Sequence, residues 1–107
     1  MKASGIVFDA LGDPMRRTIL EKLRKRPLAV GNIAKGLPVS RPAVSQHIKV
    51  LERARLICID HQGTKSICRI DFEGMLAVRN YLDQFWGDAL AAFKVVAEKT
   101  EKSKKKL

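Results

Sequence analysis

Hydrophobic residues recur at helical spacing over most of the chain. The pattern predicts a short helix near residues 6–11 and further helices over 14–26, 30–37, 40–56 and 72–98. Between the last two helices, the sequences LICID and SICRI alternate apolar and polar residues and flank HQGT, which predicts a β-hairpin with Gly63 at positive φ. The expected fold class is therefore mainly α with one small β-hairpin.

Three of these helices have recognisable starts. Asp13 precedes Pro14, Ser40 precedes Pro42 by two residues, and Asp71 precedes the last helix. A short polar side chain at the N-cap accepts a hydrogen bond from the first turn, where the missing N–H of a proline costs nothing. Two of the helices have one apolar stripe each, which we expect to be buried: Ile19, Leu20 and Leu23, and Val44, Ile48 and Leu51.

The outer face of the helix after Ser40 is the part of the sequence that most directly suggests a function. It carries short donors, an amide and cations but no carboxylate, and only Pro38 and Val39 separate Ser40 from the preceding helix. Two helices joined this tightly, followed by a hairpin, predict a winged helix-turn-helix whose second helix enters a DNA major groove. The candidate DNA-binding residues of this helix are Ser40, Arg41, Pro42, Ser45, Gln46, His47 and Lys49.

Within that set, Arg41, Ser45 and Gln46 are expected to read base edges, while Ser40 and Lys49 anchor the helix. The hairpin then acts as a wing and contacts phosphates or a minor groove through His61, Gln62, Gly63 and Lys65. The structural alternatives are a plain helical hairpin with a polar face and an ordinary solvent-exposed β-hairpin.

The last helix has more apolar residues than one buried stripe requires. An exposed patch rich in aromatic residues is typical of an interface, so we expect a two-fold dimer. The expected seam consists of Phe8, Leu11, Phe85, Trp86, Leu90 and Phe93. The alternative is that Trp86 belongs to the core of its own chain.

Composition points to a polyanionic partner. The 107 residues carry a formal charge of +10 and have a pI near 10.1, which favours nucleic acid over a membrane surface. We expect a flexible arm over residues 1–5, one domain over 6–98 and a disordered tail over 99–107, which holds five lysines and one glutamate. No apolar run is long enough to cross a membrane and no signal-peptide pattern is present, so the expected location is cytoplasmic.

The segments FDALGDPMRRTIL (residues 8–20) and SRPAVSQHIKVLERARL (residues 40–56) resemble the ArsR family of winged-helix repressors. The resemblance covers about residues 8–93 and implies a dimer held by the first and last helices. It also implies that each recognition helix occupies half of an inverted-repeat operator, usually near the repressor's own promoter.

The chain departs from the metal-sensing members of that family. Residues 28–34 contain no cysteine, the last helix contains no histidine, and His47 and His61 are the only histidines. A zinc site typically needs about four nitrogen or sulfur ligands, so we expect no metal and no cofactor. His47 is expected to be a half-buried polar residue or a phosphate donor, and the sequence identifies no small-molecule effector.

Cys58 and Cys68 lie on the two strands of the expected hairpin. A three-residue loop over 62–64 would set them opposite each other, whereas a loop of two or four residues would leave them one step out of register. The functional hypothesis is a redox switch, in which a cross-strand disulfide reshapes the wing. The alternative is two small apolar strand residues.

The leading hypothesis from the sequence is a sequence-specific, dimeric transcriptional repressor without a metal effector. The competing hypotheses are a non-specific architectural DNA-binding protein, a redox-responsive repressor and a protein–protein adaptor. An enzyme is not expected, because no catalytic triad, phosphate-binding glycine loop or carboxylate pair is recognisable.

Overall fold

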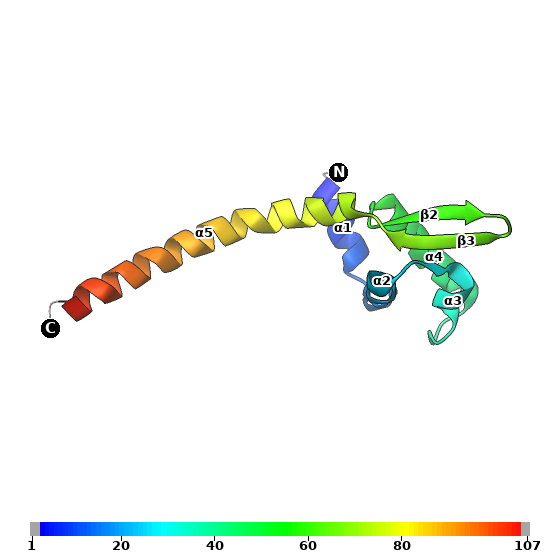
Figure 1. The fold of residues 1–107 in the computed structure, drawn as a ribbon, viewed down its shortest axis with the longest axis horizontal. Helices are drawn as coiled ribbons and strands as arrows, with labels where there is room; N and C mark the ends of the chain where they lie inside the picture. The colour runs from blue at the N-terminus through cyan, green and yellow to red at the C-terminus, as the bar shows by residue number, and fades with distance from the viewer. Residues whose placement is uncertain (1–2, 106–107) are drawn as a thin grey trace.

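The protein is described here from a computed structural model, which describes residues 3–105 and the side chains of residues 5–100. A compact head contains everything up to the start of the last helix, and that helix then projects away from it (Figure 1). The elements in order are α1 (Ala3–Leu11), α2 (Pro14–Lys25), β1 (Leu28–Ala29), α3 (Val30–Ala34), α4 (Arg41–Arg53), β2 (Ile57–Gln62), β3 (Lys65–Ile70) and α5 (Phe72–Lys105).

The core of the head lies between α2, α4 and the sheet. It consists of apolar side chains from α1 to α4, including both stripes predicted from the sequence, from the segment between α4 and β2, and from β2 and β3: Val7, Ala10, Ile19, Leu20, Leu23, Ile33, Val44, Ile48, Leu51, Ala54, Leu56, Ile57 and Cys68. The helical periodicity of α2 and α4 therefore identified their buried faces correctly.

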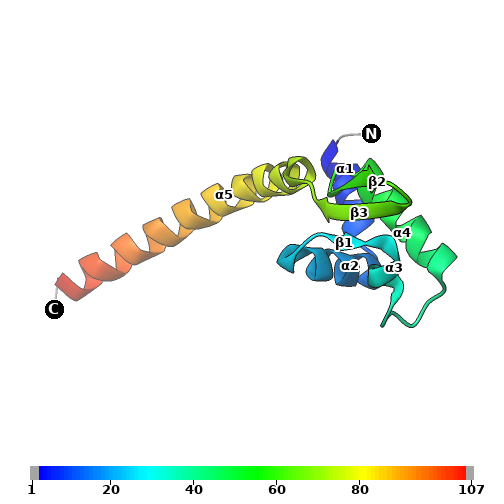
Figure 2. The same ribbon diagram turned by 45° about the vertical axis from the view of Figure 1, so that its right-hand side comes forward.

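The sheet has three strands in the order β1-β3-β2, one more strand than the predicted hairpin (Figure 2). β1 pairs antiparallel with β3 through Leu28 and Ala29. β2 and β3 are joined by a two-residue turn, with Gln62 opposite Lys65 and Gly63 at φ +62°. A glycine with positive φ at the first central position is typical of a type II′ turn, which confirms the expectation for Gly63.

The helix starts predicted from the sequence are confirmed. Asp13 accepts hydrogen bonds from the backbone N–H groups of Met15 and Arg16, and Ser40 Oγ accepts one from Ala43 N at 3.3 Å. Asp71 Oδ1 accepts from Glu73 N at 3.0 Å. These interactions depend only on near neighbours in the chain, which is why the sequence reveals them.

Two helices end earlier than expected because residues after them adopt positive φ. α3 ends at Ala34 rather than residue 37, ahead of Gly36 at φ +85°. α4 ends at Arg53, and Arg55 at φ +59° follows its cap. Leu56 N donates to Leu51 O and Arg55 N donates to Glu52 O, the hydrogen-bond pattern of a Schellman motif.

The first turn of α5 fits closely against this end of α4. Gly74 N donates to Arg55 O at 2.7 Å, and a β-carbon at residue 74 would lie 2.5 Å from the same oxygen. Arg55 and Glu73 form an ion pair across the same junction. Glycine at residue 74 thus allows the backbones to approach, and this contact sets where α5 leaves the head.

α5 is longer than expected and gives the molecule principal extents of 72 × 30 × 22 Å. The helix continues through residues 99–105, where a disordered tail was expected, because lysine and glutamate are good helix formers. Residues 3–5 of the expected N-terminal arm belong to α1, while residues 1–2 and 106–107 lie outside the described residues. Within the described part of the chain, no helix has the length and apolar character required to span a bilayer.

Candidate nucleic-acid interface

α4 buries Val44, Ile48 and Leu51 and turns a polar stripe to the solvent. Residues three or four positions apart lie on the same side of a helix. Four exposed residues of α4 follow one another at this spacing: Pro42, Gln46, Lys49 and Arg53. We call these four residues the α4 stripe. An exposed helix face with an amide and two cations is suited to the donor and acceptor pattern of a major groove.

Arg41 and Ser45 lie on the flank of α4 that faces α3 and the wing. Both line a cavity of about 480 Å³ together with Lys35, which follows α3, and Lys65 on β3. The remaining lining residues are uncharged: Ala29, Val30, Gly31, Asn32, Thr64 and Ser66. We call this hollow the wing cavity. Its three cations face no carboxylate among the lining residues.

The wing extends from the head as the turn between β2 and β3. His61, Gln62, Gly63 and Lys65 are all exposed at or near its tip, as a DNA-contacting wing requires. His61 Nδ1 lies 3.1 Å from Ser66 Oγ across the strands. Arg69 Nε donates a 3.0 Å hydrogen bond to Asp60 Oδ2, so its charge is already paired. Lys65, the cation nearer the tip of the wing, takes part in no ion pair among the described residues.

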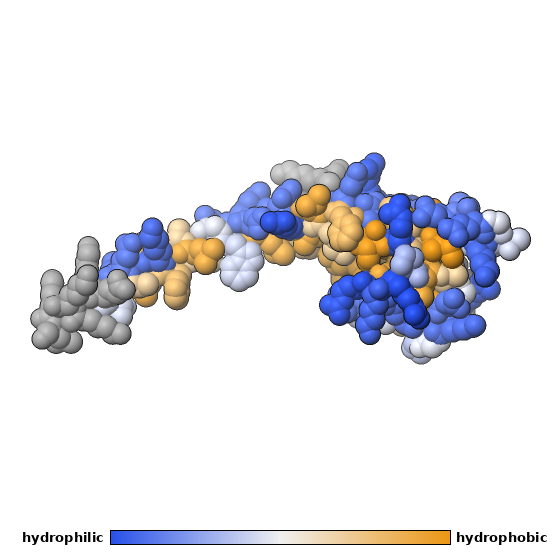
Figure 3. Space-filling model, viewed as in Figure 1, coloured by the Kyte–Doolittle hydropathy of each residue, from blue (hydrophilic) through white to orange (hydrophobic). Residues whose placement is uncertain are grey.

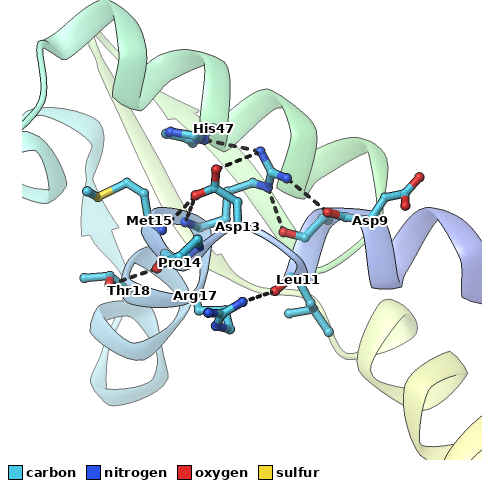
Figure 4. Close-up of polar contacts among 10 residues, drawn as sticks. Asp9, Leu11, Asp13, Pro14, Met15, Arg17, Thr18 and His47 are labelled. Carbon is cyan, nitrogen blue, oxygen red and sulfur yellow. Dashed lines mark hydrogen bonds and ion pairs between the residues drawn. The ribbon is translucent and has the colours of Figure 1, made fainter.

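The opposite flank of α4 contacts a polar network that includes Asp9, Asp13 and His47 (Figure 4), and the contacts of Arg16 lie at its centre. Arg16 Nε donates to Ala10 O at 2.6 Å and Nη2 donates to Asp9 O at 3.0 Å, so the guanidinium satisfies carbonyls at the end of α1. Arg16 Nη1 lies 3.4 Å from His47 Nδ1 and 3.9 Å from Asp13 Oδ2. One side chain therefore joins α1, the cap of α2 and α4.

Arg17 extends the same arrangement by donating to Leu11 O at 2.7 Å. The two consecutive arginines thus cap the last carbonyls of α1. His47 is half-buried, as expected, and belongs to this network rather than to the exposed α4 stripe.

The charges around Asp13 affect its ionisation. Partial desolvation raises the pKa of this carboxyl group, but hydrogen bonds from the Arg16 and Met15 N–H groups and the charges of His47 and Arg16 outweigh it, so the pKa is lowered overall. The carboxylate form is favoured in the folded state, and its contribution to stability is lost as the pH falls through the lowered pKa.

Replacing Arg16 with lysine is expected to lower the free energy of unfolding by about 1–3 kcal/mol, because a single ammonium group cannot reproduce the forked contacts. The Arg16 side chain is only 17% exposed. The matched control is Arg24→Lys, at a position that is 71% exposed and paired with Glu21, where a change within about 0.5 kcal/mol is expected. Urea denaturation measures both, and equal losses for the two variants would contradict the positioning role.

The predicted dimer residues lie on α1 and on the projecting part of α5, which presents apolar side chains along one side (Figure 3). Phe8 stacks edge-on against Tyr81, with ring centroids 5.0 Å apart, and Tyr81 in turn contacts Phe85 at 5.2 Å. Trp86 is 61% exposed and Phe93 is 70% exposed, so the alternative of a core role for Trp86 within its own chain is wrong. Leu11 is half-buried and Leu90 is exposed.

The two cysteines are not opposite each other. Cys58 pairs with Arg69 and Cys68 pairs with Ile59, which places the two thiols on opposite faces of the hairpin. Cys68 is buried in the core, and burial raises its pKa to about 11, with a smaller contribution from Glu52. The pKa of Cys58 is also raised, first by desolvation and then by its hydrogen bond with Asp71. A cross-strand disulfide as a redox switch is therefore wrong for this pair, because the turn has two residues rather than three.

Residues 3–105 bring together no cluster of three or more histidine, cysteine, aspartate or glutamate side chains that could hold a metal ion. His47 is on α4 beside Arg16, and His61 is on the wing beside Ser66. The structure adds Asn32, Lys35 and Ser66 to the candidate surface, which sequence reasoning missed. Their proximity to Arg41 depends on how β3 packs beside α3, for which the sequence offers no local pattern.

Comparison with known proteins agrees with this geometry. A protein-family model described as "Bacterial regulatory protein, arsR family" matches residues 13–58. The chain is 51% identical over 86 residues to the HTH-type transcriptional regulator Rv2034 of Mycobacterium tuberculosis, covering 80% of each protein.

Solved structures show the same architecture. A crystal structure of an ArsR family transcriptional regulator, RHA00566, superposes with a TM-score of 0.76 at 31% identity, covering 80% of this chain and 94% of that one. The homodimeric winged helix-turn-helix DNA-binding domain of Mb0332 from Mycobacterium bovis superposes with a TM-score of 0.64 at 26% identity, covering 80% and 79%. The chain therefore belongs to the ArsR family of bacterial regulatory proteins, as a transcriptional regulator with a DNA-binding winged helix-turn-helix.

Proposed function

We propose that this regulator is a sequence-specific, dimeric repressor that binds an inverted-repeat operator. The observation that carries the proposal is the α4 stripe, an exposed helix face with Gln46 at its centre and cations beyond it. An asparagine or glutamine amide can bond to adenine with two hydrogen bonds, and such a pair contributes about 1–3 kcal/mol of discrimination. Gln46 is the expected base reader, with Ser45 beside it and Lys49 as an anchor.

The proposed dimer uses the apolar side of α5. Leu82, Trp86, Ala89, Phe93 and Val96 follow one another at spacings of four, three, four and three residues, which is the spacing of a helical seam between two chains. Four of these five are large and at least 42% exposed in the single chain. A second copy of the same helix is the occupant that suits a self-complementary stripe, with Phe8 and Leu11 at the edge of the contact.

We further propose that the repressor works without a metal effector. The proposal rests on the surroundings of the candidate ligands: His47 contacts Arg16, His61 contacts Ser66, and the Cys68 thiol is buried with a raised pKa. A metal ligand must be deprotonated and share a site with other ligands, and these groups are on separate parts of the head.

The competing function is a non-specific architectural DNA-binding protein, favoured by the charge of +10 and the lysine-rich end of the chain. A chain ending at residue 98 separates the two functions. We expect it to keep its preference for a duplex selected from a random pool over an unrelated duplex, while its affinity for both falls because phosphate contacts are lost. Loss of that preference together with most of the affinity would support the architectural function instead.

A further inference from the structure

Arg41 faces the wing cavity and does not belong to the α4 stripe. Gln46 and Lys49 lie on the α4 stripe, whereas Arg41 is one position away from Pro42 on the flank of the helix and lines the cavity. A β-carbon at Gly31 would lie 3.8 Å from Arg41 Nη2, so the guanidinium folds back over α3. Arg41 was expected to read base edges, but its guanidinium points to the space between the recognition helix and the wing.

The chemistry of the cavity is that of an anion site. Lys35, Arg41 and Lys65 converge on it, and Asn32, Ser45 and Ser66 add neutral hydrogen-bonding groups. None of the three cations takes part in an ion pair among the described residues. Like charges gathered without a counter-charge repel one another, so an anion in the cavity would relieve this repulsion.

The position of the cavity identifies the anion. The recognition helix of a winged helix-turn-helix occupies the major groove, and a wing reaches the adjacent groove. One sugar-phosphate strand separates those two grooves, so it must cross the protein surface between α4 and the β2–β3 turn. The wing cavity lies in that space, between Arg41 and Ser45 on one side and Thr64 and Lys65 on the other.

We propose that the wing cavity seats a DNA phosphodiester, held by Lys35, Arg41 and Lys65, and that Arg41 is a phosphate ligand rather than a base reader. This inference rests on the proposed DNA-binding function and deepens it. Phosphate contacts position a protein on the duplex without distinguishing bases. The wing cavity would therefore fix where the protein sits along the duplex, and Gln46 would provide the sequence preference.

The test measures the salt dependence of binding for Lys35→Ala, Arg41→Ala and a control, Lys94→Ala, on a duplex selected from a random pool and on an unrelated duplex. Lys94 is an exposed cation on the projecting part of α5, so the control removes the same charge far from the cavity. For each cavity variant, the slope of log affinity against log salt should fall by about 0.9 per subunit, about 1.8 for a bound dimer, with equal fold-losses on both duplexes. The control should keep the wild-type slope.

A chemical probe of the DNA completes the experiment. Single methylphosphonate substitutions, each of which removes one phosphate charge, should weaken wild-type binding at every contacted phosphate. At one position in each half-site, that penalty should shrink for the Lys35→Ala, Arg41→Ala double variant. The proposal would be overturned if the salt slopes of Lys35→Ala and Arg41→Ala equalled that of the Lys94→Ala control. It would also be overturned if Arg41→Ala changed the base preference without losing affinity for the unrelated duplex. If the wild type preferred no sequence, the result would count against the repressor function and not against the cavity. The salt slopes on the unrelated duplex would still test the cavity.

Discussion

Replacing Trp86 with glutamate is expected to convert the protein from dimer to monomer and to weaken operator binding by about 10²–10⁴-fold, the usual gain from linking two binding units. Trp86 is 61% exposed in the single chain and lies in the middle of the proposed α5 seam. A buried aromatic side chain covers about 150–250 Å² at an interface, and a carboxylate in its place would face its own copy across the two-fold axis.

The matched control is Gln84→Glu, which adds the same charge to an exposed position of α5 outside the seam. Sedimentation equilibrium gives the oligomeric state, and titration of a selected duplex gives the affinity. Neither substitution touches the core of the head, so both variants should keep the helix content of the wild type in circular dichroism. Gln84→Glu should also unfold like the wild type, whereas Trp86→Glu should lose the stability that dimerisation adds. A Trp86→Glu protein that remains dimeric with wild-type affinity would contradict the proposed seam.

The second large effect is expected at Gln46. Gln46→Ala should cost about 1–3 kcal/mol of binding free energy for each half-site of the selected duplex and should relax the preference at one base pair in each. The side chain is exposed on the α4 stripe, so its loss should not disturb folding.

Lys49→Ala is the control for Gln46, because Lys49 is the next residue of the same stripe and carries a charge instead of an amide. It should weaken binding to all sequences alike. The measurement is a set of affinities on duplexes that carry each of the four base pairs at every position. An unchanged base preference in Gln46→Ala would exclude Gln46 as the reader.

The features that the sequence predicts well are those set by neighbouring residues. Asp13 and Ser40 cap helices through hydrogen bonds that span two or three residues, and the apolar stripe of α4 follows from helical periodicity alone. The positive φ at Gly63 likewise depends on a tight turn between two alternating segments.

The features that the sequence does not predict depend on contacts between distant segments. β1 has only two residues and exists because β3 lies beside it, and the register of Cys58 against Cys68 depends on a turn one residue shorter than the in-register alternative. Arg16 caps α1 from α2, and Lys35 joins Arg41 across the wing cavity. These residues resemble ordinary surface cations until the fold brings their partners together.

In the proposed dimer, two copies of α4 read DNA sequence together. The most direct measurement is selection of bound duplexes from a random pool by the full-length protein, followed by sequencing. We predict enrichment of an inverted repeat whose half-site centres are separated by about 10–10.5 base pairs or a multiple of that distance. Recovery of sequences with no shared motif, or of a single asymmetric site, would contradict the claim.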